Sequence, residues 1–113
     1  MGTWKSLDGI KIGIIGAGLS GLSLASLALR KKAEVFVSDL GSRREIAAGE
    51  MASKGIDFEF GGHGPRLWES DMIVLSSGIS PGSPAVKKAQ EMGIPVVGEL
   101  DFVAPYLKGR LLS

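Results

Sequence analysis

The stretch at residues 11–21, KIGIIGAGLSG, constrains the fold of this chain more than any other part of the sequence. An apolar run at 12–15 has the character of a buried strand, and a helical pattern begins directly after the glycine-rich turn. The glycines of this turn follow the GxGxxG spacing. A strand, a glycine turn and a helix in this order predict the first part of a βαβ unit.

Each glycine of the turn has a physical task. Gly16 allows the tight turn that leaves the strand, Gly18 lets a ligand phosphate approach the backbone, and Gly21 lets the new helix pack closely on the strand. The helix N-terminus adds unpaired N–H groups and the positive end of the helix dipole, which favour an anion. The turn therefore predicts a nucleotide site, and the alternative is a close-packed turn that binds no ligand.

The composition limits the classes of protein to which the chain can belong. A length of 113 residues favours one domain, and 44% hydrophobic with 22% charged residues is ordinary for a globular protein. The net charge of +1 argues against a broad surface for nucleic acid or membrane. The absence of cysteine fits a reducing compartment, and no apolar stretch approaches the roughly 20 residues of a membrane span. We therefore expect a cytoplasmic protein.

A second candidate site residue, Asp39, ends the next predicted strand. It follows Gly21 at about the spacing at which an acidic residue meets a nucleotide ribose. A carboxylate accepts hydrogen bonds from a sugar or a base edge, and it repels a 2′-phosphate. The alternative is a turn or N-cap aspartate for the following helix, where Ser42 and Glu45 also resemble a capping box.

The rest of the chain alternates between strand-like and helix-like segments. The loop after the third predicted strand holds His63, the only histidine. A hydrogen bond between its ring and the backbone is the favoured interpretation, and a ligand contact is the alternative. A metal site has no support in the neighbouring sequence. The predicted strands are 11–15, 34–38, 56–60, 71–76 and 94–97, and the predicted helices are 19–32, 43–54, 84–92 and 101–107, with a short helical turn near 67–68.

The fourth predicted strand ends in a second loop of the kind that binds ligands, SSGISPG at 76–82. It offers small residues, hydroxyl groups and exposed N–H groups at the carboxyl end of a strand. Ser83 and Pro84 then fit the N-cap and the first position of the next helix.

These elements predict an α/β fold: a Rossmann-like, doubly wound, five-stranded parallel sheet in three αβα layers. With the strand order 3-2-1-4-5, the first and fourth strands are neighbours at the point where the winding reverses, and ligands bind there. The glycine turn, the 76–82 loop and Asp39 then converge on one crevice. The sequence has no cysteine, no GxSxG and no P-loop motif, so we expect a binding module without catalytic residues or a metal.

The chain also carries a set of motifs that extends beyond the glycine turn. They are GIIGAGLSGLSLA, VFVSD, GGH, DMIVLSSGISPGSPAV, GIPVVGELDF and a terminal RLLS. Together they resemble the amino-terminal domain of the Mur ligases, and most closely that of the D-glutamate-adding members. The similarity runs over about 11–113. Its most specific part is the pairing of the glycine turn with the 76–82 loop.

The resemblance implies a three-domain cytoplasmic enzyme of peptidoglycan synthesis, whose first domain holds the UDP part of UDP-N-acetylmuramoyl-L-alanine. The middle domain would carry an ATP-binding P-loop and magnesium sites, and the last domain would help to bind D-glutamate. Ligation would pass through an acyl phosphate that the amine of D-glutamate attacks. On this basis 1–10 is a flexible lead-in, 11–109 is the UDP-binding domain and 110–113 begins the ATPase domain. The chain alone would then hold no cofactor and would not be catalytic.

The resemblance also assigns residues to the UDP site by their positions. N–H groups and the Ser20 hydroxyl at the helix start would contact the diphosphate or uridine, Asp39 would hold the uracil or ribose, and the loop around Gly78 would close the other wall. Family members often have polar residues after the aspartate, whereas this chain has Leu40 and Gly41, so a backbone contact must serve there. The expected UDP-binding residues are Gly18, Leu19, Ser20, Asp39, Leu40, Ser77, Gly78 and Ile79.

Two other functions stay open at this point. GxGxxG with Asp39 suits the NAD(P)-binding domain of an oxidoreductase equally well. A regulatory or assembly module with an empty cleft is the third possibility.

Overall fold

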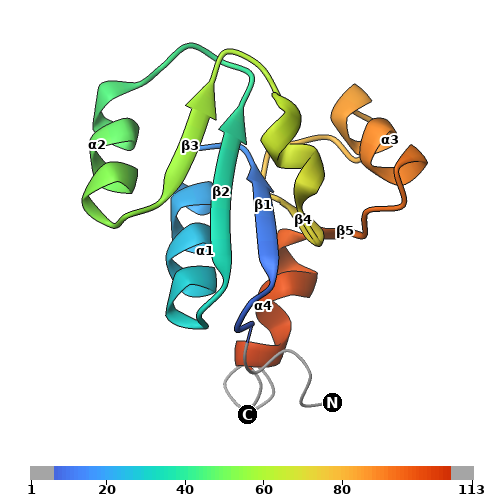
Figure 1. The fold of residues 1–113 in the computed structure, drawn as a ribbon, viewed down its shortest axis with the longest axis horizontal. Helices are drawn as coiled ribbons and strands as arrows, with labels where there is room; N and C mark the ends of the chain where they lie inside the picture. Colours follow the sequence, from blue (N-terminus) through green and yellow to red (C-terminus); the bar gives the residue numbers. More distant parts are fainter. Residues whose placement is uncertain (1–6, 108–113) are drawn as a thin grey trace.

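Residues 7–107 are described by a computed structural model, in which helices cover both faces of one parallel sheet (Figure 1). The strand order is β3-β2-β1-β4-β5, which confirms the order predicted from the sequence. The strands are β1 (Lys11–Ile15), β2 (Glu34–Asp39), β3 (Asp57–Phe60), β4 (Met72–Leu75) and β5 (Val96–Gly98). The helices are α1 (Leu19–Arg30), α2 (Glu45–Ser53), α3 (Pro84–Glu91), α4 (Glu99–Leu107) and the 3-10 helix η2 (Pro65–Glu69).

The strands β1 and β4 lie at the centre of the sheet because their side chains are apolar on both faces. Every residue of β4 is buried, and so is every residue of β1 after Lys11. Ile15 at the end of β1 pairs with Ser38 of β2 on one side and with Leu75 of β4 on the other. The carboxyl ends of three neighbouring strands therefore meet at one edge of the sheet, where the loops that follow them can touch.

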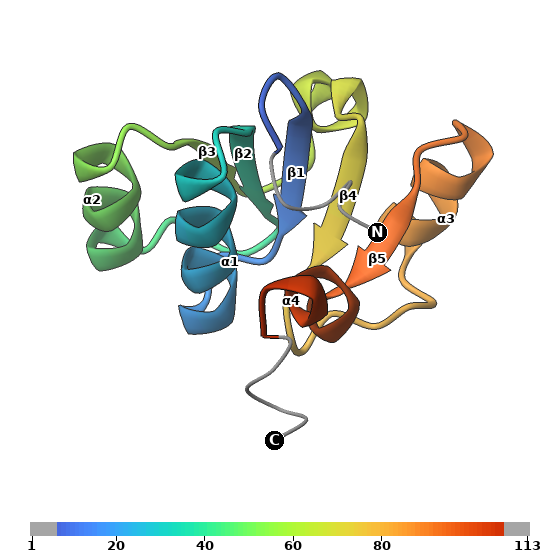
Figure 2. The same cartoon turned by 90° about the horizontal axis from the view of Figure 1, so that it is seen from below.

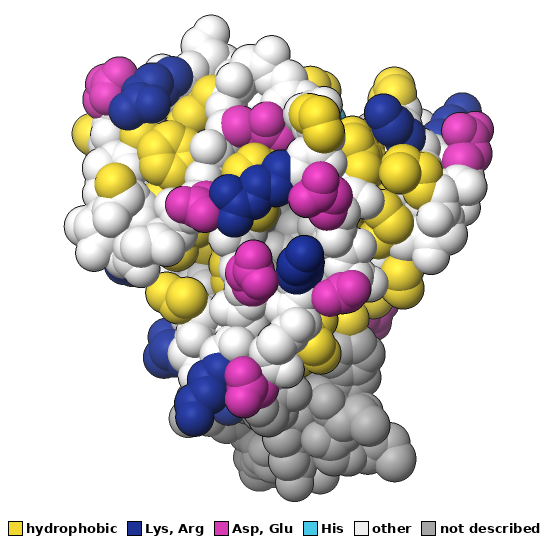
Figure 3. All heavy atoms as spheres, viewed as in Figure 1, with side chains coloured by type: hydrophobic (Ala, Val, Ile, Leu, Met, Phe, Trp, Pro, Cys, Tyr) yellow, Lys and Arg dark blue, Asp and Glu magenta, His cyan; other side chains and the backbone are white. Residues whose placement is uncertain are grey.

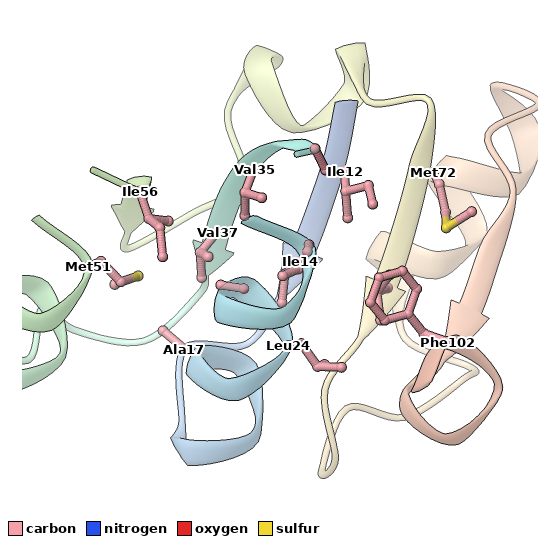
Figure 4. Close-up of a cluster of buried hydrophobic side chains, with 14 of the residues drawn as sticks. Ile12, Ile14, Ala17, Leu24, Val35, Val37, Met51, Ile56, Met72 and Phe102 are labelled. Atoms are coloured by element: carbon pink, nitrogen blue, oxygen red, sulfur yellow. The ribbon is translucent and has the colours of Figure 1, made fainter. Parts of the chain in front are cut away.

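Helices α1, α2 and α4 cover one face of the sheet (Figure 2). Leu24 of α1, Met51 of α2 and Phe102 of α4 are all buried against the strands in one hydrophobic cluster (Figure 4). Ala25 and Ala28 of α1 are fully buried, and such small side chains let this helix lie close to the sheet.

The opposite face of the sheet is covered by η2 and α3. Leu67 of η2 is fully buried, and Gly13 of β1 permits its approach because a Cβ at that position would lie 2.7 Å from Leu67 Cδ1. Val86 and Ala89 of α3 pack in the same cluster. Helices on both faces of a parallel sheet give the three-layer αβα architecture that the sequence predicted.

Helix α2 begins later than predicted, and the expected capping box is wrong. Arg44 rather than Ser42 occupies the N-cap position, and no side chain caps the helix. The physical reason is the carboxylate of Asp39, which accepts a hydrogen bond from the Gly41 N–H and pairs with the Arg44 guanidinium. These bonds hold the segment after β2 in an extended path until Glu45. The predicted boundaries of the other elements differ from the observed ones by small amounts.

The expected lead-in at 1–10 contains one residue of the core. Leu7 is fully buried, and its N–H donates to the Lys31 carbonyl at 2.8 Å. The six residues before it lie outside the described part of the chain. So do 108–113, which include the expected start of an ATPase domain at 110–113.

The surface of the molecule carries charges of both signs. On the face seen in Figure 3, acidic and basic side chains lie next to each other, in agreement with the small net charge. The ion pair of Arg66 with Asp57, 2.7 Å long, joins η2 to β3. Within residues 7–107, no helix has both the length and the apolar character needed to cross a membrane.

Candidate functional site

The glycine turn after β1 has the geometry that its sequence predicts. Gly16 has φ +104°, a conformation that favours glycine, and its N–H donates to the Ser38 carbonyl at 2.9 Å. A Cβ on Gly21 would collide with the backbone oxygen of Gly16, so this glycine allows α1 to start against the turn. Gly18 is the N-cap residue of α1, and a Cβ there would meet no atom of the described residues within 4 Å. The space beside Gly18 is therefore open.

The N-terminus of α1 is free to attract an anion. Among residues 7–107 no side chain caps the helix, and its first turn holds no acidic residue. The first N–H groups of an α-helix have no partner inside the helix, and they carry the positive end of the helix dipole. The turn therefore presents backbone donors beside the open space at Gly18.

The loop after β4 is hydrogen-bonded to the start of α1. The Ser77 N–H donates to Ser20 Oγ at 3.0 Å, and the two hydroxyl oxygens lie 3.1 Å apart. The Ser77 N–H also lies 2.9 Å from a carboxylate oxygen of Glu99, at the start of α4. The Ser76 hydroxyl donates to the Ile15 carbonyl at 2.9 Å, and this bond ties the start of the loop to the end of β1. The two loops that the sequence singled out therefore lie side by side.

Asp39 ties the glycine turn to the segment after β2. Its Oδ2 accepts the Ala17 N–H at 2.7 Å and pairs with Arg44 Nη2 at 3.1 Å, while Oδ1 accepts the Gly41 N–H at 2.7 Å. Burial alone would raise the pKa of Asp39, but the hydrogen bonds from Ala17 and Gly41 and the charge of Arg44 outweigh it and lower that pKa. Asp39 caps the turn that follows β2 through the Gly41 N–H, as one half of the alternative interpretation predicted, but it is not the N-cap of the next helix, because Arg44 occupies that position. The contact of Asp39 with a ligand stays a prediction.

A cavity of about 290 Å³ lies beside Asp39, at the carboxyl ends of the central strands. Four of the predicted site residues line it, and they are Asp39, Leu40, Gly78 and Ile79. Gly78 has φ +94°, which brings the backbone of the second loop to the cavity without a side chain. The other residues of the lining are Ile15, Gly16, His63, Ser80, Ser83, Pro84 and Ala85.

The remaining predicted residues lie around this cavity rather than inside it. Gly18 and Leu19 line a groove of about 490 Å³ between α1 and α2, and the Leu19 side chain is 87% exposed. Ser77 lines another hollow, of about 500 Å³, together with Glu99. Ser20 is held by its hydrogen bonds to Ser77. The site predicted as one crevice is thus divided around the N-terminus of α1.

His63 has a different partner from the one that the sequence favoured. Its Nδ1 lies 2.6 Å from Oγ of the fully buried Ser38, so the interpretation as a histidine bonded to the backbone is wrong. Ser38 in turn donates to Glu59 Oε2 at 2.6 Å. Ser38 and Glu59 are direct neighbours in the register of β2 and β3, and this parallel pairing is the signal that sequence reasoning missed. Glu99 was missed too, because only the fold brings it to Ser77.

The charge state of His63 follows from its surroundings. Burial lowers the pKa of its imidazole below the ordinary value, and the opposing charges of Glu59 and Asp39 do not cancel that effect. No group of three or more metal-ligating side chains occurs among residues 7–107. The structure therefore favours a neutral histidine in the wall of the cavity.

Comparison with known sequences finds a family described as the MurD N-terminal domain, which matches residues 11–85. Two similar curated proteins are the UDP-N-acetylmuramoylalanine–D-glutamate ligases of Chlorobaculum parvum and Pelodictyon phaeoclathratiforme. The first is 33% identical over 109 residues and the second 37% identical over 107 residues, which is 96% and 95% of this chain. The matched part is 23% of each ligase. The chain thus spans about a quarter of the length of these relatives.

Solved structures share the fold of this chain. The UDP-N-acetylmuramate–alanine ligase of Thermotoga maritima superposes with a TM-score of 0.71 and 21% identity, over 88% of this chain and 23% of the ligase. The shikimate dehydrogenase of Aquifex aeolicus gives a TM-score of 0.58 and 17% identity, over 87% of this chain and 45% of the enzyme. A ligase and a dehydrogenase both contain this fold, so the fold alone does not choose between their ligands.

Proposed function

This chain belongs to the family of MurD N-terminal domains of peptidoglycan-synthesis ligases, and we propose that it binds the UDP end of UDP-N-acetylmuramoyl-L-alanine. The name of its relatives, UDP-N-acetylmuramoylalanine–D-glutamate ligase, supports this choice of substrate. In this proposal the chain holds the nucleotide-linked substrate for a D-glutamate-adding ligase. ATP, Mg²⁺ and D-glutamate would be bound by the parts of the ligase that this chain does not match, so the chain is not catalytic alone.

The observation that carries the proposal is the contact of the two loops at Ser20 and Ser77. It brings the uncapped N-terminus of α1 next to the loop after β4 at the reversal point of the sheet, where α/β sheets bind their ligands. A diphosphate would accept hydrogen bonds from N–H groups at Leu19 and Ser20. Gly18 has no side chain to obstruct its approach, and no acidic side chain of the first turn repels it.

The cavity beside Asp39 suits the uridine end of the ligand. Leu40 and Ile79 supply apolar walls for a flat base, and Asp39 supplies a carboxylate. Each carboxylate oxygen has more than one lone pair, so a ribose hydroxyl can bind Asp39 in addition to the protein donors. The volume of the cavity, about 290 Å³, is just below the range of about 300 to 1,000 Å³ that is usual for small-molecule sites.

A titration that compares UDP with NAD tests the proposed function. Isotope-labelled chain is titrated with each nucleotide, and the backbone amide resonances are followed by NMR. We expect UDP to shift the amides of Leu19, Ser20 and Gly78 together. Binding of NAD without any effect of UDP would assign the chain to the dinucleotide-binding class instead. No response to either nucleotide would favour a module with an empty cleft.

A further inference from the structure

The carboxylate of Glu99 lies beside the groups that the proposed function assigns to the diphosphate. Its Oε1 accepts the Ser77 N–H at 2.9 Å, and the same N–H donates to Ser20 Oγ at 3.0 Å. Ser20 belongs to the first turn of α1, whose N–H groups are the proposed donors to the diphosphate. A negative side chain therefore shares one hydrogen-bond donor with the site that is proposed to hold a negative ligand.

The hollow beside Ser77 holds no positive side chain that would offset this charge. Among residues 7–107 its lining includes two carboxylates, those of Glu99 and Asp101, and no lysine, arginine or histidine. Both carboxylates belong to the first turn of α4. The N-terminus of that helix carries about half a positive charge, which compensates only part of the negative charge of the two side chains. We therefore expect a negative electrostatic potential in this hollow.

The hollow continues the cavity in which the uridine end is proposed to bind. Ile79 lines both, while Gly78 lines only the cavity and Ser77 only the hollow. The groove between α1 and α2, in contrast, shares no lining residue with the cavity among residues 7–107. A diphosphate that leaves the cavity along the shared wall passes the start of α1 and ends at Ser77. Its terminal phosphate, which carries the sugar in the proposed substrate, then lies next to the Glu99 carboxylate.

We propose that Glu99 is a specificity residue that makes the site favour an esterified diphosphate over free UDP. This inference rests on the proposed function and names the feature of the substrate that the site selects. The terminal phosphate of a UDP-sugar is a diester with a single negative charge. In free UDP the same phosphate loses a second proton with a pKa of about 6, and above that pH it carries one negative charge more. A carboxylate beside it repels this additional charge, and repulsion of the wrong ligand is a general source of specificity.

The donors around Glu99 act in the same direction. The Ser77 N–H already serves two oxygen atoms, one of Glu99 and one of Ser20, so it offers little to a further anion. The N-terminus of α1 attracts both ligands, but its charge of about one half is smaller than the full charge of a carboxylate. At comparable distances the repulsion of the additional charge by Glu99 therefore exceeds its attraction by the helix.

A comparison of UDP with the methyl ester of its terminal phosphate tests the proposal, because the two ligands differ by one charge and one methyl group. Isothermal titration calorimetry at about pH 8, above the pKa of the phosphate, measures both affinities for the wild type, Glu99→Gln and Glu91→Gln. Glu99→Gln removes the charge and keeps an amide oxygen that can accept the Ser77 N–H. Glu91 is exposed at the end of α3 and lies outside the lining of the hollow, so Glu91→Gln is the control for the change in net charge.

We expect the wild type to bind the ester more tightly than UDP. Glu99→Gln should strengthen the binding of UDP relative to the ester by about fivefold, which corresponds to about 1 kcal/mol. Glu91→Gln should keep the wild-type ratio of the two affinities. At about 1 M salt the Debye length falls to about 3 Å, so the ratio in the wild type should approach that in Glu99→Gln.

The possible outcomes separate this inference from the proposed function. If both ligands bind with the same ratio of affinities in the wild type and in Glu99→Gln, the role of Glu99 is overturned and the proposed function stands. An equal loss of affinity for both ligands in Glu99→Gln would also overturn it, since a side chain that only holds the loop affects both ligands alike. If the wild type binds neither UDP nor its ester, the proposed function fails and this inference fails with it.

Discussion

Asp39 and His63 line the same cavity, yet their polar atoms are used in opposite ways. Both carboxylate oxygens of Asp39 are engaged by the protein, through Ala17, Gly41 and Arg44. His63 uses one ring nitrogen to contact Ser38, and its other ring nitrogen has no hydrogen-bond partner among residues 7–107. The glycine motif shows the same division. Gly21 is required by the packing of the turn, whereas Gly18 leaves open space. The site therefore contains groups that its own packing uses and groups that its packing leaves unused.

Substitutions can test whether a given residue builds the site or serves a ligand. Residues that build the site should affect the free energy of unfolding without any ligand. Residues that face the ligand should change affinity and leave that free energy nearly unchanged. The contrast is useful because Asp39 and Gly21 belong to the motif from which a nucleotide site is ordinarily predicted.

The largest effect is expected for Gly21→Ala. The new methyl group would collide with the Gly16 carbonyl oxygen, which belongs to the backbone and cannot move without distorting the turn. We expect a loss of about 3 kcal/mol in the free energy of unfolding, the upper end of the usual range for overpacking. Urea unfolding followed by circular dichroism measures it. Gly49→Ala is the control, because it adds a methyl group in α2 where no atom lies within 4 Å. Equal stabilities of the two variants would contradict the assignment.

A smaller loss of stability is expected for Asp39→Ala. It leaves the N–H groups of Ala17 and Gly41 and the guanidinium of Arg44 without their acceptor. Part of this surface is exposed, so water replaces some of the lost bonds, and we expect a loss of about 2 kcal/mol in ligand-free chain. Asp39→Asn keeps one acceptor oxygen and should lose less. A stability within about 0.5 kcal/mol of the wild type would show that Asp39 serves the ligand alone.

Gly18→Ala should separate binding from stability. Gly18 has φ −78°, which alanine adopts without strain, and its Cβ would point into open space. We expect an unchanged free energy of unfolding but about tenfold weaker binding of UDP, or about 1.4 kcal/mol, because the methyl group occupies the path of the diphosphate. Isothermal titration calorimetry at constant salt measures the affinity. If this variant binds UDP with the affinity of the wild type, the diphosphate does not bind at the glycine turn.

The smallest expected effects are on the dependence of stability on pH. The pKa of His63 is lowered in the folded chain, so the unfolded chain takes up the proton first and stability falls as the pH drops below about 6.5. The pKa of Asp39 is lowered too, and its contribution is present above about 3.9 and is lost as the pH falls further. Unfolding in urea at a series of pH values measures both. His63→Gln should abolish only the loss of stability below about pH 6.5, and Asp39→Asn should abolish only the loss below about pH 3.9.

Much of the fold could be predicted from the sequence because it depends on short-range patterns. The apolar run of β4 marks a strand that is buried on both faces, and Gly16 marks the turn that leaves β1. The strand order then follows from the rules of parallel sheets. The start of α2 could not be predicted, because the bonds of Asp39 to Gly41 and Arg44 displace the local capping signal.

The candidate site could be predicted in its location but not in its details. The adjacency of the two loops followed from the strand order. The distribution of Gly18 and Ser77 over neighbouring hollows did not, because it depends on how α2 and α4 pack beside α1. The role of His63 was missed because its partners Ser38 and Glu59 lie on two strands. A search for polar residues paired in register across predicted neighbouring strands would have found them.

The central claim is that the glycine turn and the loop after β4 form one site for a uridine diphosphate. A crystal structure of the chain with UDP tests it most directly. We predict diphosphate oxygens within hydrogen-bond distance of the N–H groups of Leu19 and Ser20, and the base in the cavity lined by Leu40 and Ile79. UDP bound away from both loops, with that cavity empty, would contradict the account.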